Sequence, residues 1–338
     1  MKLTYKNKLL ERSVIAVNFL AMTVVIATFV LLYGFTEPVL PAALLHTVQA
    51  VMVFVFLTEK IVRFFNTESR LDFLKVNWFE IPLVIGLIVV AVGAGRWFAE
   101  MHRSEVILTA ISGYLVLQAI SKVCLGMVLL ASSGRNPTLV LIALFISLIC
   151  AGAGLLMLPR AHHLEQMTVT DAFFTATSAT CVTGLIVVDT GTAFTQMGQI
   201  IILTLIQLGG LGIVIFGAVL ALLLGQALSV KESLAMQDLL SARTLNRIRV
   251  MIGFIFVATL VIEGIGVMAL YPMWDNVPGA VEPPRQWYYS IFHAVSAFCN
   301  AGFSLFESSL IDYNDSLGVY AVIAPLIILG GLGFGVLY

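Results

Sequence analysis

One short apolar segment occurs twice in this chain, and this duplication constrains the fold more than any other feature. The first copy reads Ser-Ala-Thr-Cys-Val-Thr-Gly over residues 178–184, and the second reads Ser-Ala-Phe-Cys-Asn-Ala-Gly over residues 296–302. Each copy is followed by the same Gly-Gly-Leu-Gly run, at residues 209–212 and 330–333. A segment repeated with the same flanking run predicts two copies of one structural unit.

The composition of the chain places it in a membrane. Hydrophobic residues make up 60% of the 338 residues and charged residues 11%, whereas a soluble domain carries about 25% charged residues. With a net charge of −1 and no basic tract, the chain gives no indication of a nucleic-acid partner. The four cysteines lack metal-ligand spacing, so we expect neither a disulfide framework nor a transition-metal site.

Seven apolar stretches reach the length of about 20 residues that a bilayer requires, and an eighth begins near residue 319. The seven lie near residues 14–33, 44–63, 79–97, 106–130, 137–158, 198–225 and 250–272. With the N-terminus inside, 14 of the 18 lysine and arginine residues fall on the cytoplasmic side, as the positive-inside rule requires. We therefore expect a multi-pass protein of the cell membrane with a cytoplasmic N-terminus, embedded in the lipid bilayer. Both copies of the duplicated segment then lie on the outer side.

The residues before each copy predict a short helix that enters the membrane and returns. Residues 168–179 have a threonine N-cap and an acidic first turn, and Pro283 and Pro284 suit the start of the second short helix. Twelve residues at a rise of about 1.5 Å cross only about half of the hydrocarbon core. Non-helical backbone at that depth is tolerated only beside a water-filled path. The carboxyl end of each short helix favours a cation there.

We therefore expect an ion-selectivity filter in which main-chain carbonyls replace the hydration shell of a potassium ion. Its candidate residues are Thr180, Cys181, Val182, Thr183 and Gly184 in the first copy, and Phe298, Cys299, Asn300, Ala301 and Gly302 in the second. Asp189 and Glu307 follow the two copies and either attract cations at the outer mouth or anchor the returning chain. Transport of this kind needs no organic cofactor, and potassium is the substrate.

Further residues allow more than one interpretation. Glu263 lies inside an apolar stretch, where a carboxylate is costly and often functional; alternatively, it hydrogen-bonds a neighbouring repeat. Helix-packing surfaces are expected at Gly209, Gly210, Gly330 and Gly331. Pairing within the N-terminal region is expected for Glu59, Glu80 and Lys122. Surface or interface positions are expected for His46, His102, His162, His163 and His293.

Three motifs carry a resemblance to a known family. They are Gly-Leu-Ile-Val-Val-Asp-Thr from Gly184, Gln-Leu-Gly-Gly-Leu-Gly from Gln207, and Gly-Leu-Leu-Met-Leu-Pro at residues 154–159. With the basic connector at residues 231–249, they closely resemble the Trk/Ktr/HKT superfamily of potassium transporters, and within it the bacterial Trk and Ktr membrane subunits. The resemblance covers about residues 137–338.

This resemblance implies an all-α polytopic membrane protein with helix–pore loop–helix repeats around a pseudo-fourfold pore. It implies potassium uptake, with a glycine in each filter favouring potassium and a serine at the first such position favouring sodium. Gly184 and Gly302 both match the potassium pattern. It also implies a homodimer that binds a cytosolic ring of nucleotide-binding regulatory subunits.

The family has four repeats in one chain, whereas two are visible in this sequence. We expect the chain to be part of a longer protein, and the alternative is a two-repeat cation channel completed by dimerisation. An ion-coupled secondary transporter is a further alternative, although the repeats of such proteins are usually inverted and these two share one orientation. No hydrolase, phosphate-binding or dinucleotide motif is present, so we do not expect an enzyme.

The N-terminal region is predicted to form a separate four-helix membrane bundle. We expect domains at residues 1–135, 136–248 and 249–338, of which the second and third are the two repeats, the second ending in the cytosolic connector. Residues 56–64 and 77–80 weakly resemble the second and third helices of a voltage sensor. The fourth stretch lacks the arginine series that carries gating charge, so an accessory bundle is expected rather than a working sensor.

Overall fold

The computed structural model describes residues 5–37, 39–76, 82–87, 89–90, 106–119, 137–163, 167–212, 245–274 and 283–337. These residues fall into two compact units, one up to residue 119 and the other from residue 137 onwards. The described chain is helical and contains no strand beyond two isolated bridges. Three helices are long and apolar enough to cross a membrane, namely Leu9–Tyr33, Ala42–Asn66 and Gly253–Met273. The prediction of an all-α membrane protein is therefore confirmed.

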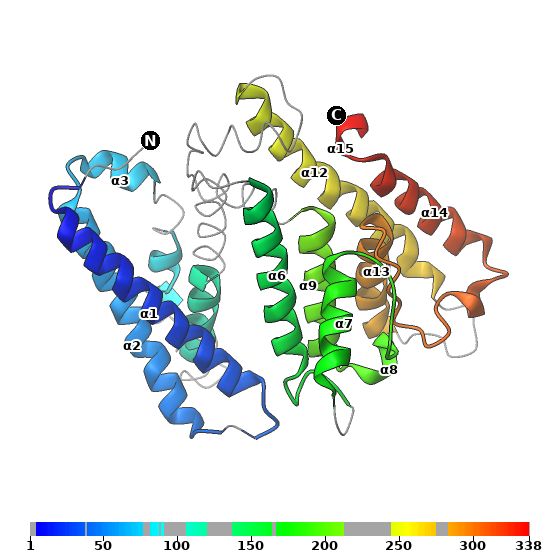
Figure 1. Ribbon diagram of the computed structural model, residues 1–338, viewed down its shortest axis with the longest axis horizontal. Coiled ribbons are helices and arrows are strands. Elements are labelled where there is room, and N and C mark those ends of the chain that lie inside the picture. Colours follow the sequence, from blue (N-terminus) through cyan, green and yellow to red (C-terminus); the bar gives the residue numbers. More distant parts are fainter. Residues whose placement is uncertain are drawn as a thin grey trace. The chain divides into compact units, whose positions relative to one another are not determined.

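The first unit is built around a helical hairpin of α1 (Lys8–Tyr33) and α2 (Ala42–Asn66), followed by α3 (Arg70–Val76) (Figure 1). Asn7 caps α1 by accepting hydrogen bonds from the main chain of the first turn. Val25, Phe56 and Leu115 form part of its buried core, so the apolar helix Val106–Ala119 packs in the same unit. The predicted boundary near residue 135 and most of the predicted stretch at 79–97 lie outside the described residues.

Ion pairs within this unit involve Glu59, one of the residues predicted to pair there. Arg63 lies 3.0 Å from Glu59 and 2.8 Å from Glu11, and Lys60 lies 3.7 Å from Glu59. Glu59 therefore pairs within α2 and, through Arg63, with α1. Glu80 and Lys122, for which pairing within this unit was also predicted, lie outside the described residues.

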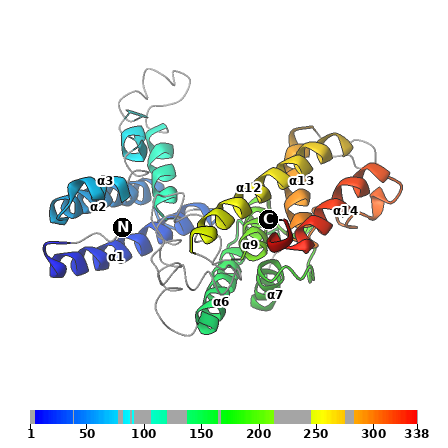
Figure 2. The same ribbon diagram turned by 90° about the horizontal axis from the view of Figure 1, so that it is seen from above.

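The second unit contains two triplets of helices, and the middle helix of each triplet is the one predicted as a short helix before a candidate filter. The first triplet comprises α6 (Pro137–Leu156), α7 (Val169–Thr180) and α9 (Gln196–Gly210), with the single turn α8 (Thr190–Ala193) before α9. The second comprises α12 (Leu245–Leu270), α13 (Pro283–Phe298) and α14 (Leu317–Leu332). Of the short elements, η1 (Tyr271–Met273) lies between α12 and α13, η2 (Ile311–Tyr313) lies between α13 and α14, and α15 (Phe334–Leu337) follows α14. In each triplet the middle helix packs against both outer helices (Figures 1 and 2).

The same small-residue contact holds each triplet together. A Cβ placed on Gly152 of α6 would lie 2.7 Å from the side chain of Leu205 in α9 and 3.4 Å from Cβ of Ala176 in α7. In the second triplet, a Cβ on Gly266 of α12 would lie 2.8 Å from the Leu326 side chain and 3.3 Å from Cβ of Ala294. Small residues of this kind let helices approach closely in a membrane, where the hydrophobic effect does not drive helices together. The sequence duplication is thus matched by a duplication of packing.

One hydrophobic core joins the two triplets. Phe194, Leu205 and Ile206 from the first triplet are buried together with Phe292 and Phe303 from the second. A further cluster around Trp274 belongs to the second triplet alone.

Candidate ion-conduction site

The short helices α7 and α13 end in the same hydrogen-bonded turn. In the first copy, the main-chain nitrogens of Val182 and Thr183 donate to the carbonyls of Ala179 (3.3 Å) and Ser178 (3.0 Å). In the second copy, the corresponding bonds run from Asn300 to Ala297 (3.0 Å) and from Ala301 to Ser296 (2.7 Å). This pair of bonds is the Schellman motif, which satisfies the last carbonyls of a helix and reverses the chain.

After each short helix the backbone alternates between positive and negative φ. Val182 has φ +50° and Gly184 has φ +75°, whereas Asn300 has φ +57° and Gly302 has φ +73°. The residues between them, Thr183 and Ala301, do not have positive φ. A left-handed conformation costs an L-residue about 1–2 kcal/mol, and it is a true outlier for β-branched valine. Strained backbone of this kind clusters at functional sites.

The two copies meet at their glycines. A Cβ on Gly184 would lie 2.8 Å from the carbonyl oxygen of Ala301 and 3.3 Å from Cα of Gly302. A Cβ on Gly302 would lie 3.2 Å from Cα of Gly184. Residues 180–184, the first candidate filter, and residues 298–302, the second candidate filter, therefore lie side by side. Glycine is needed at both positions, because of the positive φ and of the close approach.

The repeated Gly-Gly-Leu-Gly runs support the ends of the short helices. A side chain on Gly209 of α9 would overlap the carbonyl of Thr180, and one on Gly330 of α14 would overlap the carbonyl of Phe298. Gly210 faces the second copy, where a Cβ would lie 2.6 Å from Sγ of Cys299. These glycines were predicted to form helix-packing surfaces. The structure places Gly209 and Gly330 against the last residues of α7 and α13, and Gly210 against Cys299, so these glycines pack on the carboxyl ends of the short helices.

Asp189 and Glu307 differ in their surroundings. The Asp189 carboxylate accepts hydrogen bonds from the main-chain nitrogen and the hydroxyl of Thr192, each at 2.7 Å, and so caps the single turn α8. Of the two roles left open for Asp189, these contacts correspond to anchoring of the returning chain. Glu307 is exposed.

Gln199 of α9 holds the loop after the first candidate filter, a role that no sequence pattern predicted. Its amide nitrogen faces three carbonyls, those of Phe194 (3.0 Å), Gly191 (3.2 Å) and Thr190 (3.3 Å). Its amide oxygen accepts a hydrogen bond from the hydroxyl of Tyr288 in α13 at 3.0 Å. The first loop is thereby tied to the second repeat.

His293 of α13 holds the loop after the second candidate filter. Its Nδ1 lies 2.8 Å from the carbonyl of Tyr289, and so carries the proton, while its Nε2 lies 3.0 Å from the Ser304 hydroxyl and accepts from the nitrogen of Leu305 at 3.4 Å. The prediction of a surface or interface position for His293 is wrong, because the side chain is 3% exposed and packs within its own repeat. Its position in the duplicated short helix, opposite a returning loop, was the available signal.

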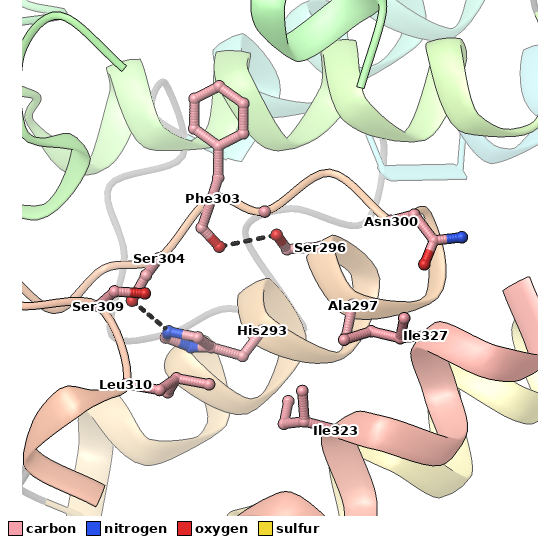
Figure 3. Close-up of a pocket in the computed structure, with 11 residues that line it drawn as sticks. His293, Ser296, Ala297, Asn300, Phe303, Ser304, Ser309, Leu310, Ile323 and Ile327 are labelled. Atoms are coloured by element: carbon pink, nitrogen blue, oxygen red, sulfur yellow. Dashed lines mark hydrogen bonds between the residues drawn. The ribbon is translucent and has the colours of Figure 1, made fainter. Parts of the chain in front are cut away.

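A cavity of about 230 Å³ lies behind the second candidate filter (Figure 3). His293, Asn300 and Ser304 line it together with Ile323 and Ile327 of α14. The hydroxyl of Ser296 donates to the carbonyl of Phe303 at 2.7 Å and closes the returning chain over the cavity. In the part of the chain that the structure describes, no group of three or more metal-ligating side chains is placed to hold a metal ion.

Glu263 of α12 contacts the first triplet. Nε2 of Gln207 in α9 donates to its two carboxylate oxygens at 3.1 and 3.4 Å. Of the two interpretations left open for this carboxylate, a hydrogen bond to the neighbouring repeat is therefore present.

The fold defines the chain as an all-α membrane protein with a duplicated three-helix unit. The model of the TrkH family, described as a cation transport protein, matches residues 113–338. The chain therefore belongs to the TrkH family of cation transport proteins. This membership confirms the resemblance to the Trk/Ktr superfamily, and it confirms the prediction that the chain is not an enzyme, because the family is one of transporters.

Individual relatives agree with the family. The chain is 40% identical over 206 residues to the Ktr system potassium uptake protein B of Bacillus subtilis, and 38% identical over 211 residues to the protein of that name from Vibrio alginolyticus. It is 36% identical over 200 residues to the potassium/sodium uptake protein NtpJ of Enterococcus hirae. These matches cover 59–61% of the chain and 44% of each relative. The chain thus spans less than half the length of these relatives.

Proposed function

We propose that this chain takes part in potassium uptake across the cell membrane, through a filter to which both candidate filters contribute main-chain carbonyls. The observation that carries the proposal is the meeting of Gly184 and Gly302, which brings two strained turns from distant parts of the chain to one place. Relatives that are named as potassium uptake proteins support the choice of ion.

The geometry suits the replacement of an ion's water by backbone oxygens. In an extended strand successive carbonyls point to opposite sides. Positive φ at alternate residues rotates the peptide planes between them, so that successive carbonyls can point toward the same side. The ligands are main-chain atoms, which explains why Val182 and Asn300 can differ while the turn is the same. The carboxyl ends of α7 and α13 add the negative end of the helix dipole, and potassium needs no cofactor to pass.

The remaining features of the full protein follow the family resemblance. The charge distribution favours a cytoplasmic N-terminus, with the candidate filters toward the outer side. We propose that the protein is a homodimer that binds a cytosolic nucleotide-binding regulatory ring, and that further helix–pore loop–helix repeats complete a pseudo-fourfold pore. The N-terminal unit is proposed to be an accessory bundle.

Rubidium uptake and growth at low potassium test this function, in a bacterium that lacks its own potassium uptake systems and expresses the full-length gene. The test variant is Gly184→Ser, and the matched control is Gly154→Ser on α6, where a Cβ would have no neighbour within 4 Å. We expect uptake by the native and control proteins, and a shift from rubidium toward sodium for Gly184→Ser. Absence of uptake by native protein that is present in the membrane with its regulatory partner would refute the proposal. An unchanged ion preference in Gly184→Ser would refute the assignment of the filter.

A further inference from the structure

A buried carboxylate lies at the junction of the two repeats. The side chain of Glu263, in the apolar middle of α12, is only 6% exposed. Within the described residues, no lysine, arginine or histidine lies at ion-pair distance from it, and its hydrogen-bond donor is the amide of Gln207. Burying a carboxyl group is costly unless hydrogen bonds compensate, and both oxygens of Glu263 accept from the Gln207 amide. Glu263 therefore fixes the orientation of Gln207 firmly.

The Gln207 side chain extends this contact to the second candidate filter. Its oxygen lies 3.9 Å from Sγ of Cys299, which donates to it. Cys299 is the residue between the end of α13 and the left-handed Asn300. Gly210, one turn further along α9, packs directly on Cys299. The end of α9 thus touches the second candidate filter through two residues, one of which is held by Glu263.

The same helix end also touches the first candidate filter, since Gly209 packs against the carbonyl of Thr180. The last turn of α9 therefore contacts both candidate filters. Glu263 of the second repeat fixes this turn through its hydrogen bonds with Gln207. The pair has no counterpart elsewhere in the described repeats. In the packing-equivalent positions, Ile149 stands on α6 for Glu263 and Ile328 on α14 for Gln207.

We propose that Glu263 and Gln207 are positioning residues that set the geometry of the second candidate filter, and hence the affinity and selectivity of the pore for its cation. The proposal rests on the proposed function. Because coordination by carbonyls depends on their spacing around the ion, release of Gln207 changes ion binding even when the fold is retained. A pair that only stabilised the fold would change the amount of protein and leave ion affinity unchanged.

The test is a reciprocal exchange of the two side chains in the full-length protein. Gln207→Glu places two carboxylates face to face, whereas the double variant Gln207→Glu/Glu263→Gln restores one carboxylate and one amide in reversed positions. Glu263→Gln completes the cycle. Thr204→Val is the control, because Thr204 lines the groove between α9 and α12 that Gln207 and Glu263 also line, but its hydroxyl bonds only its own helix at 2.7 Å. The readouts are KM and Vmax for rubidium, inhibition by sodium, and the amount of protein in the membrane.

We expect Gln207→Glu to raise the rubidium KM about tenfold, which corresponds to about 1.4 kcal/mol. Interaction energies of this size are common between residues in direct contact. The double variant should recover most of that loss, and Thr204→Val should match the native protein. An unchanged KM in Gln207→Glu, or a double variant no better than Gln207→Glu, would overturn the proposal.

The failure of the proposed function can be told apart from the failure of this inference. If the native protein takes up no rubidium, the proposed function has failed, and potassium-dependent shifts of the melting temperature of the purified variants take the place of KM. A shift that is lost in Gln207→Glu and restored in the double variant supports the positioning role. A shift that is equal in all four proteins, or absent from the native protein, overturns it.

Discussion

Gln199 offers the sharpest quantitative test of how the first loop is held. Its amide nitrogen has two hydrogens for three carbonyl acceptors at 3.0–3.3 Å, and its oxygen accepts a further bond from Tyr288. Three full hydrogen bonds at about 1 kcal/mol net each give a cost of about 3 kcal/mol for Gln199→Met. Tyr288→Phe removes one of these bonds and should cost about 1 kcal/mol.

The two changes should not add. Gln199→Met already removes the acceptor of the Tyr288 hydroxyl, so the double variant should cost about 3 kcal/mol and not about 4. With an unfolding entropy of about 2.1 cal/mol/K per residue, a chain of 338 residues shifts its melting temperature by about 1.4 °C per kcal/mol. The melting temperature should therefore fall by about 4 °C for Gln199→Met and by about 1.4 °C for Tyr288→Phe. The assay is thermal unfolding of the purified protein in detergent, followed by tryptophan fluorescence.

The control is Tyr289→Phe, on the same helix, because the Tyr289 hydroxyl makes no hydrogen bond among the described residues; it should leave the melting temperature unchanged. The reasoning is refuted if the decreases for Gln199→Met and Tyr288→Phe are equal, or if they add in the double variant. Either result would mean that Gln199 does not join the loop to α13.

Two further predictions concern the supports of the candidate filters. Gly209→Ala should lower the melting temperature and rubidium uptake strongly, because its Cβ would overlap the carbonyl of Thr180, whereas Gly264→Ala should have little effect, because a Cβ there has no neighbour within 4 Å; equal effects would contradict the close packing. His293→Leu should cost about 2 kcal/mol in stability through the loss of its bonds to Tyr289 and Leu305. Thr175→Val, at the equivalent position of α7, should be neutral or stabilising, because that buried hydroxyl has no hydrogen-bond partner among the described residues. A large loss of stability in Thr175→Val would speak against the comparison.

The sequence predicted the helices well where local signals mark their ends. The first short helix was expected at residues 168–179 and is found at Val169–Thr180 with Thr168 as its cap. The second short helix spans Pro283–Phe298 and begins at the expected pair of prolines. The stretch expected at 198–225 begins as α9 at Gln196, and its part beyond residue 212 lies outside the described residues. Caps and prolines act within a few residues, so these features can be read from the chain alone.

The site was predictable only in part, because much of it depends on contacts between distant residues. The duplication indicated which segments correspond, but not that Gly184 and Gly302 would meet. Nothing local predicts a positive φ for Val182, since a β-branched residue disfavours it, and the hydrogen bonds of the buried turn impose it. Gln199 and Gln207 were missed for the same reason, as their partners lie on other elements.

The core that joins the triplets has a consequence for how the protein is made. Phe194, Leu205 and Ile206 are covered by Phe292 and Phe303, which are synthesised about a hundred residues later. When the first repeat leaves the ribosome and enters the membrane, its inner face has no partner, and its outer loop lacks the Tyr288 hydroxyl that secures Gln199. The first repeat therefore matures only after the second has been inserted, and a nascent chain halted between them presents that uncovered face to lipid or to the insertion machinery.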